Sequence, residues 1–161
     1  MNGAKAFFDT NVLLYMYGGD AGKQARAKEL FRQYARAGRM LLSTQVVQEF
    51  YAAGSRKLGM PRRELRDATA ALLDSPLIIV GPSHITSAIE NEERYKISFW
   101  DALILAAAES GDAELLYTED LNDGQQYETV LVRIPSARLI PGQPTGRWRP
   151  DPSRILAAGA R

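Results

Sequence analysis

The stretch Ala6-Phe7-Phe8-Asp9-Thr10-Asn11-Val12-Leu13, residues 6–13, changes from apolar to polar and back to apolar within one short run. The apolar residues up to Phe8 predict a short buried strand. Asp9, Thr10 and Asn11 are residue types that cap helix N-termini, so they predict a short helix from Val12 to about Tyr17. The stretch therefore predicts a buried strand that passes into a helix through a carboxylate.

The same alternation of strand and helix continues along the chain. Further strands are predicted at residues 40–42, 77–80, 115–117 and 130–134. Amphipathic or apolar helices are predicted at residues 21–37, 44–58, 61–73, 83–95 and 98–110. This alternation predicts an α/β fold, a three-layer sandwich in which helices cover both faces of a parallel sheet of about five strands.

The composition is that of an ordinary globular protein with one hydrophobic core. Of the 161 residues, 45% are hydrophobic and 24% are charged, and no apolar run is long enough to span a bilayer. The chain has no cysteine, which excludes disulfides and thiolate metal sites. Because the N-terminus also lacks the apolar core of a signal peptide, we expect a cytoplasmic protein.

Basic residues are concentrated in two stretches, residues 24–39 and 56–66, although the net charge is only +1. Such basic faces could hold a polyanion such as RNA beside an acidic cleft. Solvated helix faces are the more common explanation of basic stretches, and the sequence leaves both interpretations open.

The C-terminal residues 138–161 differ in composition from the rest of the chain. Prolines and glycines recur there, and Trp148 stands between Arg147 and Arg149. This composition is typical of an extended or disordered segment. We therefore expect a folded domain at residues 1–137 and a basic tail at residues 138–161.

Four acidic residues stand beside apolar segments, where charged side chains are least expected. Asp9 directly follows the first predicted strand, and Asp120 lies shortly after the strand predicted at residues 115–117. Glu49 borders the apolar face of a predicted helix, and Asp101 is the only charge between Ile97 and Ala108. A half-buried carboxylate is costly, and several that lie close together repel one another. If the four converge at the carboxyl edge of the sheet, a divalent cation must hold them together.

Each acid also has a purely structural explanation. Asp9 could cap the following helix, and Asp101 could form a capping box with Ser98. Asp120 could stabilise a turn, and Glu49 could face water. Capping is compatible with metal binding, and acids at successive strand-to-helix junctions would form an all-oxygen site suited to Mg²⁺ or Mn²⁺.

Several other chemistries are excluded or disfavoured by the residues present. A metal-free ribonuclease with paired histidines is excluded, because the only histidine is His84, which stands at a predicted helix start. Phosphatases that form an aspartyl phosphate carry a second Asp where this chain has Asn11. Tyr15, Tyr17 and Tyr51 could stack on bases, but at helical spacing such residues more often belong to the core or its rim.

Four motifs, in order and on matching elements, resemble the PIN (PilT N-terminus) domain, particularly its VapC-like toxin branch, over roughly residues 4 to 135. They are Phe8-Asp9-Thr10-Asn11-Val12-Leu13, Ser43-Thr44-Gln45-Val46-Val47-Gln48-Glu49-Phe50, Ser98-Phe99-Trp100-Asp101-Ala102 and Leu116-Tyr117-Thr118-Glu119-Asp120-Leu121. The resemblance is loose between Ser55 and Val80, and it assigns no role to the tail.

The resemblance implies a metal-dependent endoribonuclease with a parallel sheet. By motif position, Asp9, Glu49, Asp101 and Asp120 match the family's catalytic and metal-binding acids, with Mg²⁺ or Mn²⁺ as the ion. Asn11 and Thr118 match supporting polar positions, and Asp123 is an alternative ligand. The toxin branch further implies an RNA substrate, a cognate antitoxin protein and a homodimer. The alternative function is an RNA-binding module of the same fold without turnover.

Overall fold

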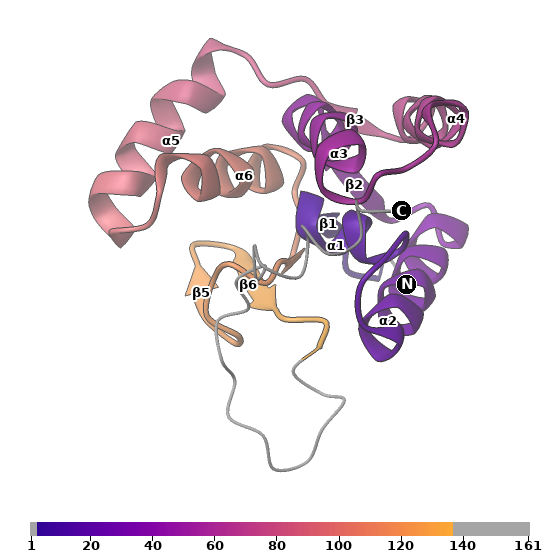
Figure 1. Ribbon diagram of the computed structural model, residues 1–161. Coiled ribbons are helices and arrows are strands. Elements are labelled where there is room, and N and C mark those ends of the chain that lie inside the picture. The colour runs from indigo at the N-terminus through magenta and orange to yellow at the C-terminus, as the bar shows by residue number, and fades with distance from the viewer. Residues whose placement is uncertain (1–2, 137–161) are drawn as a thin grey trace.

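One sheet organises the computed structural model, which describes residues 3–136 (Figure 1). The sheet in this part of the chain contains β1 (Ala6–Phe8), β2 (Met40–Ser43), β3 (Leu77–Ile78), β4 (Leu115–Tyr117), β5 (Gln126–Tyr127) and β6 (Val130–Arg133). The strand order is β3-β2-β1-β4-β6-β5, and every neighbouring pair is parallel except β5 and β6. The parallel pairing requires a crossover between consecutive strands, and helices supply most of these crossovers.

Within residues 3–136, helices pack around this sheet. They are α1 (Thr10–Tyr15), α2 (Ala21–Arg36), α3 (Thr44–Lys57), α4 (Arg62–Leu73), α5 (Pro82–Tyr95) and α6 (Phe99–Ser110). Figure 1 shows α5 alongside α6 on one side of the molecule, with α2, α3 and α4 on the other. Consecutive residues of a strand point to opposite faces, and Ala6, Phe7 and Phe8 are all fully buried, so both faces of the sheet are covered at β1.

The predicted α/β fold is confirmed, and each predicted strand and helix overlaps an observed one. The prediction of a parallel sheet of about five strands is confirmed by β1, β2, β3, β4 and β6, but the sheet also contains β5, which was not predicted and pairs antiparallel with β6. β5 has only two residues, and one of them, Gln126, is exposed. Such a segment has no apolar run, so only its hydrogen bonding to β6 makes it a strand.

Among residues 3–136, none of the helices has the length and apolar character that a membrane-spanning helix requires.

Some predictions fall outside the part of the chain that the structure describes. The tail predicted at residues 138–161 lies beyond residue 136, and the proposed boundary near residue 137 therefore stays a prediction.

The position of β1 decides where Asp9 lies. β1 is hydrogen-bonded to β2 on one side and to β4 on the other, so Asp9 follows an inner strand. The Asp9 N–H donates to the Tyr117 carbonyl over 3.0 Å, which continues the ladder past the last residue of β1. Phe8 packs against Tyr117 with ring centroids 5.2 Å apart and against Tyr34 at 5.8 Å. The backbone at the carboxyl end of β1 is therefore held on both sides.

Helix α6 is the element that presents Asp101, and its stability depends on apolar burial. Every residue from Ala102 to Ala108 is buried. Leu105→Ala should therefore lower the free energy of unfolding by about 2–5 kcal/mol, since a fully buried Leu is replaced by a cavity. Ile89→Ala, at an exposed position of α5, is the matched control and should change stability by less than about 0.5 kcal/mol. Urea unfolding measures both, and equal effects would contradict this packing.

Candidate metal centre at the carboxyl edge of the sheet

Three carboxylates meet at the carboxyl edge of the sheet. Asp9 follows β1, Asp101 lies in the first turn of α6, and Asp120 lies in the loop after β4. Each of the three offers one oxygen, and these oxygens all lie within 4.8 Å of one another. Asp9 is buried, Asp101 is half-buried and Asp120 is exposed, so the group runs from the protein interior to the solvent. We call these three residues the acidic triad.

Asp9 is the buried member of the acidic triad. Its Oδ1 accepts a hydrogen bond from the Thr10 N–H over 2.6 Å, and its Oδ2 accepts one from the Thr118 hydroxyl over 2.7 Å. The pKa of Asp9 is raised from its usual 3.8 to about 7, mainly by burial and to a smaller extent by the nearby charges of Asp120 and Glu49. The bonds from Thr118 and Thr10 act in the opposite direction, but burial outweighs them.

Asn11 and Thr118 connect Asp9 to Asp120. The Asn11 Nδ2 donates to Asp120 Oδ2 over 3.0 Å and lies 3.5 Å from Asp9 Oδ2. The Thr118 hydroxyl, which donates to Asp9, accepts a hydrogen bond from the Asp120 N–H over 3.1 Å. Asn11 and Thr118, which match supporting polar positions of the family by motif, thus each contact both Asp9 and Asp120. Their contact with the acids is observed, while their role in supporting metal ligands stays a prediction.

Asp101 is held in place by the cap of its own helix. The Ser98 hydroxyl accepts from the Asp101 N–H over 3.1 Å and donates to Asp101 Oδ2 over 2.7 Å. The pairing of Ser98 with Asp101 that the sequence predicted is therefore present. The cap does not remove Asp101 from the acidic triad, so the structural and the metal-binding explanations of this residue are compatible.

Glu49 lies beside the acidic triad but is not one of its members. Its Oε2 accepts from the Thr10 hydroxyl over 2.9 Å, and its Oε1 accepts from the Gln45 side-chain amide over 2.8 Å. Because Thr10 also donates its backbone N–H to Asp9, this residue links Glu49 to the buried acid. Glu49 contributes negative charge to Asp9, and its role as a metal ligand stays a prediction.

Asp123 has a different position from Asp120, although both lie in the loop after β4. Asp123 Oδ1 accepts from the Ile134 N–H over 2.9 Å, which joins the loop to the end of β6. It lies outside the acidic triad. Of these two candidates for the fourth acid, Asp120 is therefore the one that the fold brings to Asp9 and Asp101.

The acidic triad has the donor chemistry of a site for a hard divalent cation. All the converging atoms are carboxylate oxygens, which Mg²⁺ and Mn²⁺ prefer. Within residues 3–136, neither Asp9 nor Asp120 forms an ion pair with a basic side chain. Asn11 Oδ1 is buried and has no hydrogen-bond partner in the same part of the chain. Carboxylates without a basic partner and an oxygen without a donor both fit a cation at this position.

The structure adds one charged residue that the sequence did not single out. Glu119 is 4% exposed, and both its oxygens accept hydrogen bonds from the Ser136 hydroxyl, over 2.8 and 3.0 Å. Its Oε2 lies 4.0 Å from the Lys23 ammonium. Glu119 is therefore buried, whereas the adjacent Asp120 is exposed and belongs to the acidic triad. An acid in a polar turn is typically solvated, so no local pattern indicated this burial.

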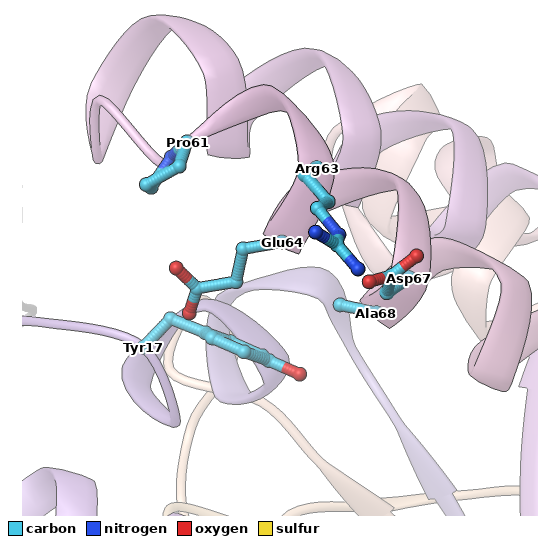
Figure 2. Close-up of a pocket in the computed structure, with 6 residues that line it drawn as sticks. All are labelled: Tyr17, Pro61, Arg63, Glu64, Asp67 and Ala68. Atoms are coloured by element: carbon cyan, nitrogen blue, oxygen red, sulfur yellow. The ribbon is translucent and has the colours of Figure 1, made fainter.

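A pocket of about 480 Å³ lies away from the acidic triad. Its lining comes from the turn after α1 and from α4, and Figure 2 shows the ring of Tyr17 below the side chains of Arg63 and Asp67. Tyr17 is 37% exposed, and burial and the charge of Glu64 raise its pKa. None of the predicted site acids lines this pocket.

The three tyrosines considered for base stacking differ in exposure. Tyr15 is buried, with 5% of its surface exposed, so its ring is not available to a base. Tyr17 and Tyr51 are partly exposed, and Tyr17 packs against Phe50. His84 lies in the first turn of α5, where the sequence predicted a helix start, and its Nδ1 accepts a hydrogen bond from the Gly81 N–H over 3.1 Å.

The raised pKa of Asp9 predicts a pH-dependent stability in EDTA. Asp9 binds its proton more tightly in the folded chain, so its stabilising contribution is full below pH 3.8 and is lost as pH rises through about 7. Asp9→Asn should remove this contribution, which amounts to at most roughly 4 kcal/mol. Urea unfolding at pH values on either side of 7 should show a flatter profile for the variant. Parallel profiles would contradict the buried position of the charge.

Glu119 predicts a second stability effect. Glu119→Ala removes the acceptor of the half-buried Ser136 hydroxyl and the carboxylate that lies 4.0 Å from the Lys23 ammonium, and should cost about 1–3 kcal/mol. Glu114→Ala, which replaces an exposed acid in the turn before β4, is the control and should stay within about 0.5 kcal/mol. Thermal unfolding compares the two, and equal values would show that the Glu119 contacts are not stabilising.

Comparison with known proteins places this site in a family. The PIN domain family matches residues 6–125. A toxin–antitoxin complex from Klebsiella pneumoniae is 21% identical with a TM-score of 0.63, and the match covers 81% of this chain and 98% of that chain. VapC20 from Mycobacterium tuberculosis, described as a sarcin–ricin loop cleaving toxin, is 23% identical with a TM-score of 0.56, covering 70% and 87%. At these identities the two structures show a shared fold.

No curated protein matches the sequence. The family match nevertheless spans most of the described residues and includes Asp9, Glu49, Asp101 and Asp120. The chain therefore belongs to the PIN domain family.

Proposed function

We propose that this protein is a divalent-metal-dependent endoribonuclease that hydrolyses RNA phosphodiester bonds. The observation that carries the proposal is the acidic triad, in which the oxygens of Asp9, Asp101 and Asp120 lie within 4.8 Å of one another. Three carboxylates this close repel one another unless a cation or protons lie between them. An all-oxygen group at the carboxyl edge of a parallel sheet suits Mg²⁺ or Mn²⁺ together with a phosphate substrate.

Each residue of the site has a distinct part in this proposal. Asp9, Asp101 and Asp120 hold the ion, with Glu49 as a further acid beside them. Bound at this position, a divalent ion supplies charge stabilisation to the phosphate and lowers the pKa of a water molecule. Asn11 and Thr118 orient the carboxylates of Asp9 and Asp120 through the hydrogen bonds described above. In hydrolysis, the water loses a proton to solvent as its oxygen bonds to phosphorus, the bond from phosphorus to the leaving oxygen breaks, and that oxygen takes up one proton from solvent.

The biological role that we propose is the toxin of a type II toxin–antitoxin pair. One similar structure is a toxin–antitoxin complex, and the other is a toxin that cleaves the sarcin–ricin loop. The first supports an antitoxin partner for this chain, and the second supports an RNA substrate. We further propose that the protein is a cytoplasmic homodimer, as the resemblance to VapC-like toxins implies, and sedimentation of the purified chain measures the oligomeric state.

The acidic triad predicts which substitutions abolish cleavage. Purified protein should cleave RNA in Mg²⁺ or Mn²⁺ and lose activity in EDTA. Asp9→Asn and Asp101→Asn should each lower activity by more than about 100-fold, because even the hydrogen-bonding partners of metal ligands typically contribute 10- to 100-fold. Thr118→Val, which removes such a hydrogen-bonding partner, should lower activity by about 10- to 100-fold. The measurement is the rate of cleavage of a labelled RNA, with Mn²⁺ binding followed in parallel by calorimetry.

The controls separate this proposal from its alternatives. Asp123→Asn should keep most of the activity, because Asp123 bonds to the end of β6 and lies outside the triad. Asp74→Asn, at the C-terminal end of α4, should have no effect. Full cleavage by Asp9→Asn protein would refute the assignment. RNA binding without cleavage or Mn²⁺ binding would instead favour an RNA-binding module without turnover.

A further inference from the structure

Trp100 is a large exposed side chain directly before a member of the acidic triad. Its surface is 63% exposed, whereas the residues from Ala102 to Ala108 of the same helix are buried. Single exposed apolar residues are common on protein surfaces, so exposure alone indicates no function. A function for Trp100 is instead indicated by its position in the first turn of α6, next to Asp101.

Trp100 and Asp101 lie in the first turn of α6, before the part of the helix that is buried on every side. Residues seven apart on a helix differ in direction by only about 20°. Ala107 and Ala108, which are seven residues beyond Trp100 and Asp101, are both fully buried in the main core. Ile104, one turn beyond Trp100, is 3% exposed. Trp100 is therefore exposed because the first turn of α6 extends past the packed part of the molecule, at the edge where Asp101 meets Asp9 and Asp120.

The indole ring of Trp100 is also held in a defined orientation. Phe99 contacts it edge to face, with ring centroids 5.3 Å apart and an interplanar angle of 74°. Phe99 in turn packs against the smaller apolar cluster between α5 and α6. A ring that is fixed from one side and open to solvent on the rest of its surface suits stacking against a flat ligand.

The charges nearby are compatible with RNA. Lys96, at the C-terminal end of α5, is exposed and forms no ion pair within residues 3–136. It stands four residues before Trp100, in the connection that leads into α6. A cation four residues before Trp100 suits a phosphate next to the one at the acidic triad.

We propose that Trp100 is a base-stacking residue that positions a nucleotide of the RNA substrate next to the scissile phosphate. The inference rests on the proposed ribonuclease function and adds a substrate-positioning residue to it. A phosphate at the acidic triad carries its nucleoside within reach of the residue adjacent to Asp101. Stacking tolerates every base because each has a flat aromatic face, so Trp100 contributes affinity for unpaired RNA.

The first test uses the fluorescence of Trp100 itself. The chain has two tryptophans, Trp100 and Trp148, so Trp148→Phe leaves Trp100 as the single indole. A short single-stranded RNA is titrated into this protein in Ca²⁺, which replaces Mg²⁺ so that turnover is slow. Stacking predicts saturable quenching of the emission, with the same affinity as a parallel anisotropy measurement on labelled RNA. Saturable RNA binding without any change in emission would overturn the proposal.

The second test separates binding from chemistry. Trp100→Leu keeps the apolar bulk but removes the aromatic face, and should raise the KM for single-stranded RNA by roughly 5- to 150-fold. The kcat at saturating RNA should change little, because the acidic triad is intact. Trp100→Phe should restore most of the affinity. Ile85→Ala, which also removes an exposed apolar side chain, is the control and should leave KM unchanged.

The outcomes distinguish this inference from the proposed function. If the wild type does not cleave RNA in Mg²⁺ or Mn²⁺, the ribonuclease proposal fails. If the wild type cleaves RNA and Trp100→Leu has an unchanged KM, only the stacking role fails, and Trp100 is then better explained as a contact for a protein partner. A KM effect in Trp100→Leu that Trp100→Phe reverses supports the stacking role.

Discussion

The electrostatic repulsion among Asp9, Asp101 and Asp120 is the constraint on which the arrangement of this protein depends. Their converging oxygens lie within 4.8 Å of one another, and burial of Asp9 adds to the cost of its charge. Hydrogen bonds from Thr10, Thr118 and Asn11 offset part of this cost. They do not offset all of it, because the pKa of Asp9 stays near 7. A cation at this position would offset the remainder, which is the physical basis for proposing a metal-dependent hydrolase.

The sheet provides the rigid support that such a site needs. β1 is paired on both sides, and its last residues are fixed by hydrogen bonds and by aromatic packing around Phe8. Asp120 is positioned less directly, through Asn11, Thr118 and the inward-facing Glu119 next to it. Asp101 depends on the apolar packing of α6. Three different structural devices therefore bring the three acids together, so damage to any one of them should affect the same site.

The same edge of the molecule carries both the acidic triad and an exposed aromatic side chain. The first turn of α6 supplies Asp101 to the triad and Trp100 to the surface beside it. In a polyanion-processing site the acids and their ion act on the phosphate, whereas an aromatic ring acts on the base. Trp100 would then contribute to RNA affinity and the adjacent Asp101 to catalysis, so substitutions at the two positions should change KM and kcat separately.

The sequence by itself determined the α/β class and nearly all the helices and strands, and it singled out the three acids that the fold brings together. It did so because apolar periodicity and capping residues are local signals, and because an acid in an apolar context is conspicuous. β5 was not predictable, since a two-residue strand exists only through its partner. Only the tertiary structure decided that Asp120 and not Asp123 joins Asp9, and that Glu119 is buried beside it. These outcomes depend on how the loop after β4 packs against α1, α2 and the end of β6, and no local pattern encodes a contact between segments that lie far apart in the chain.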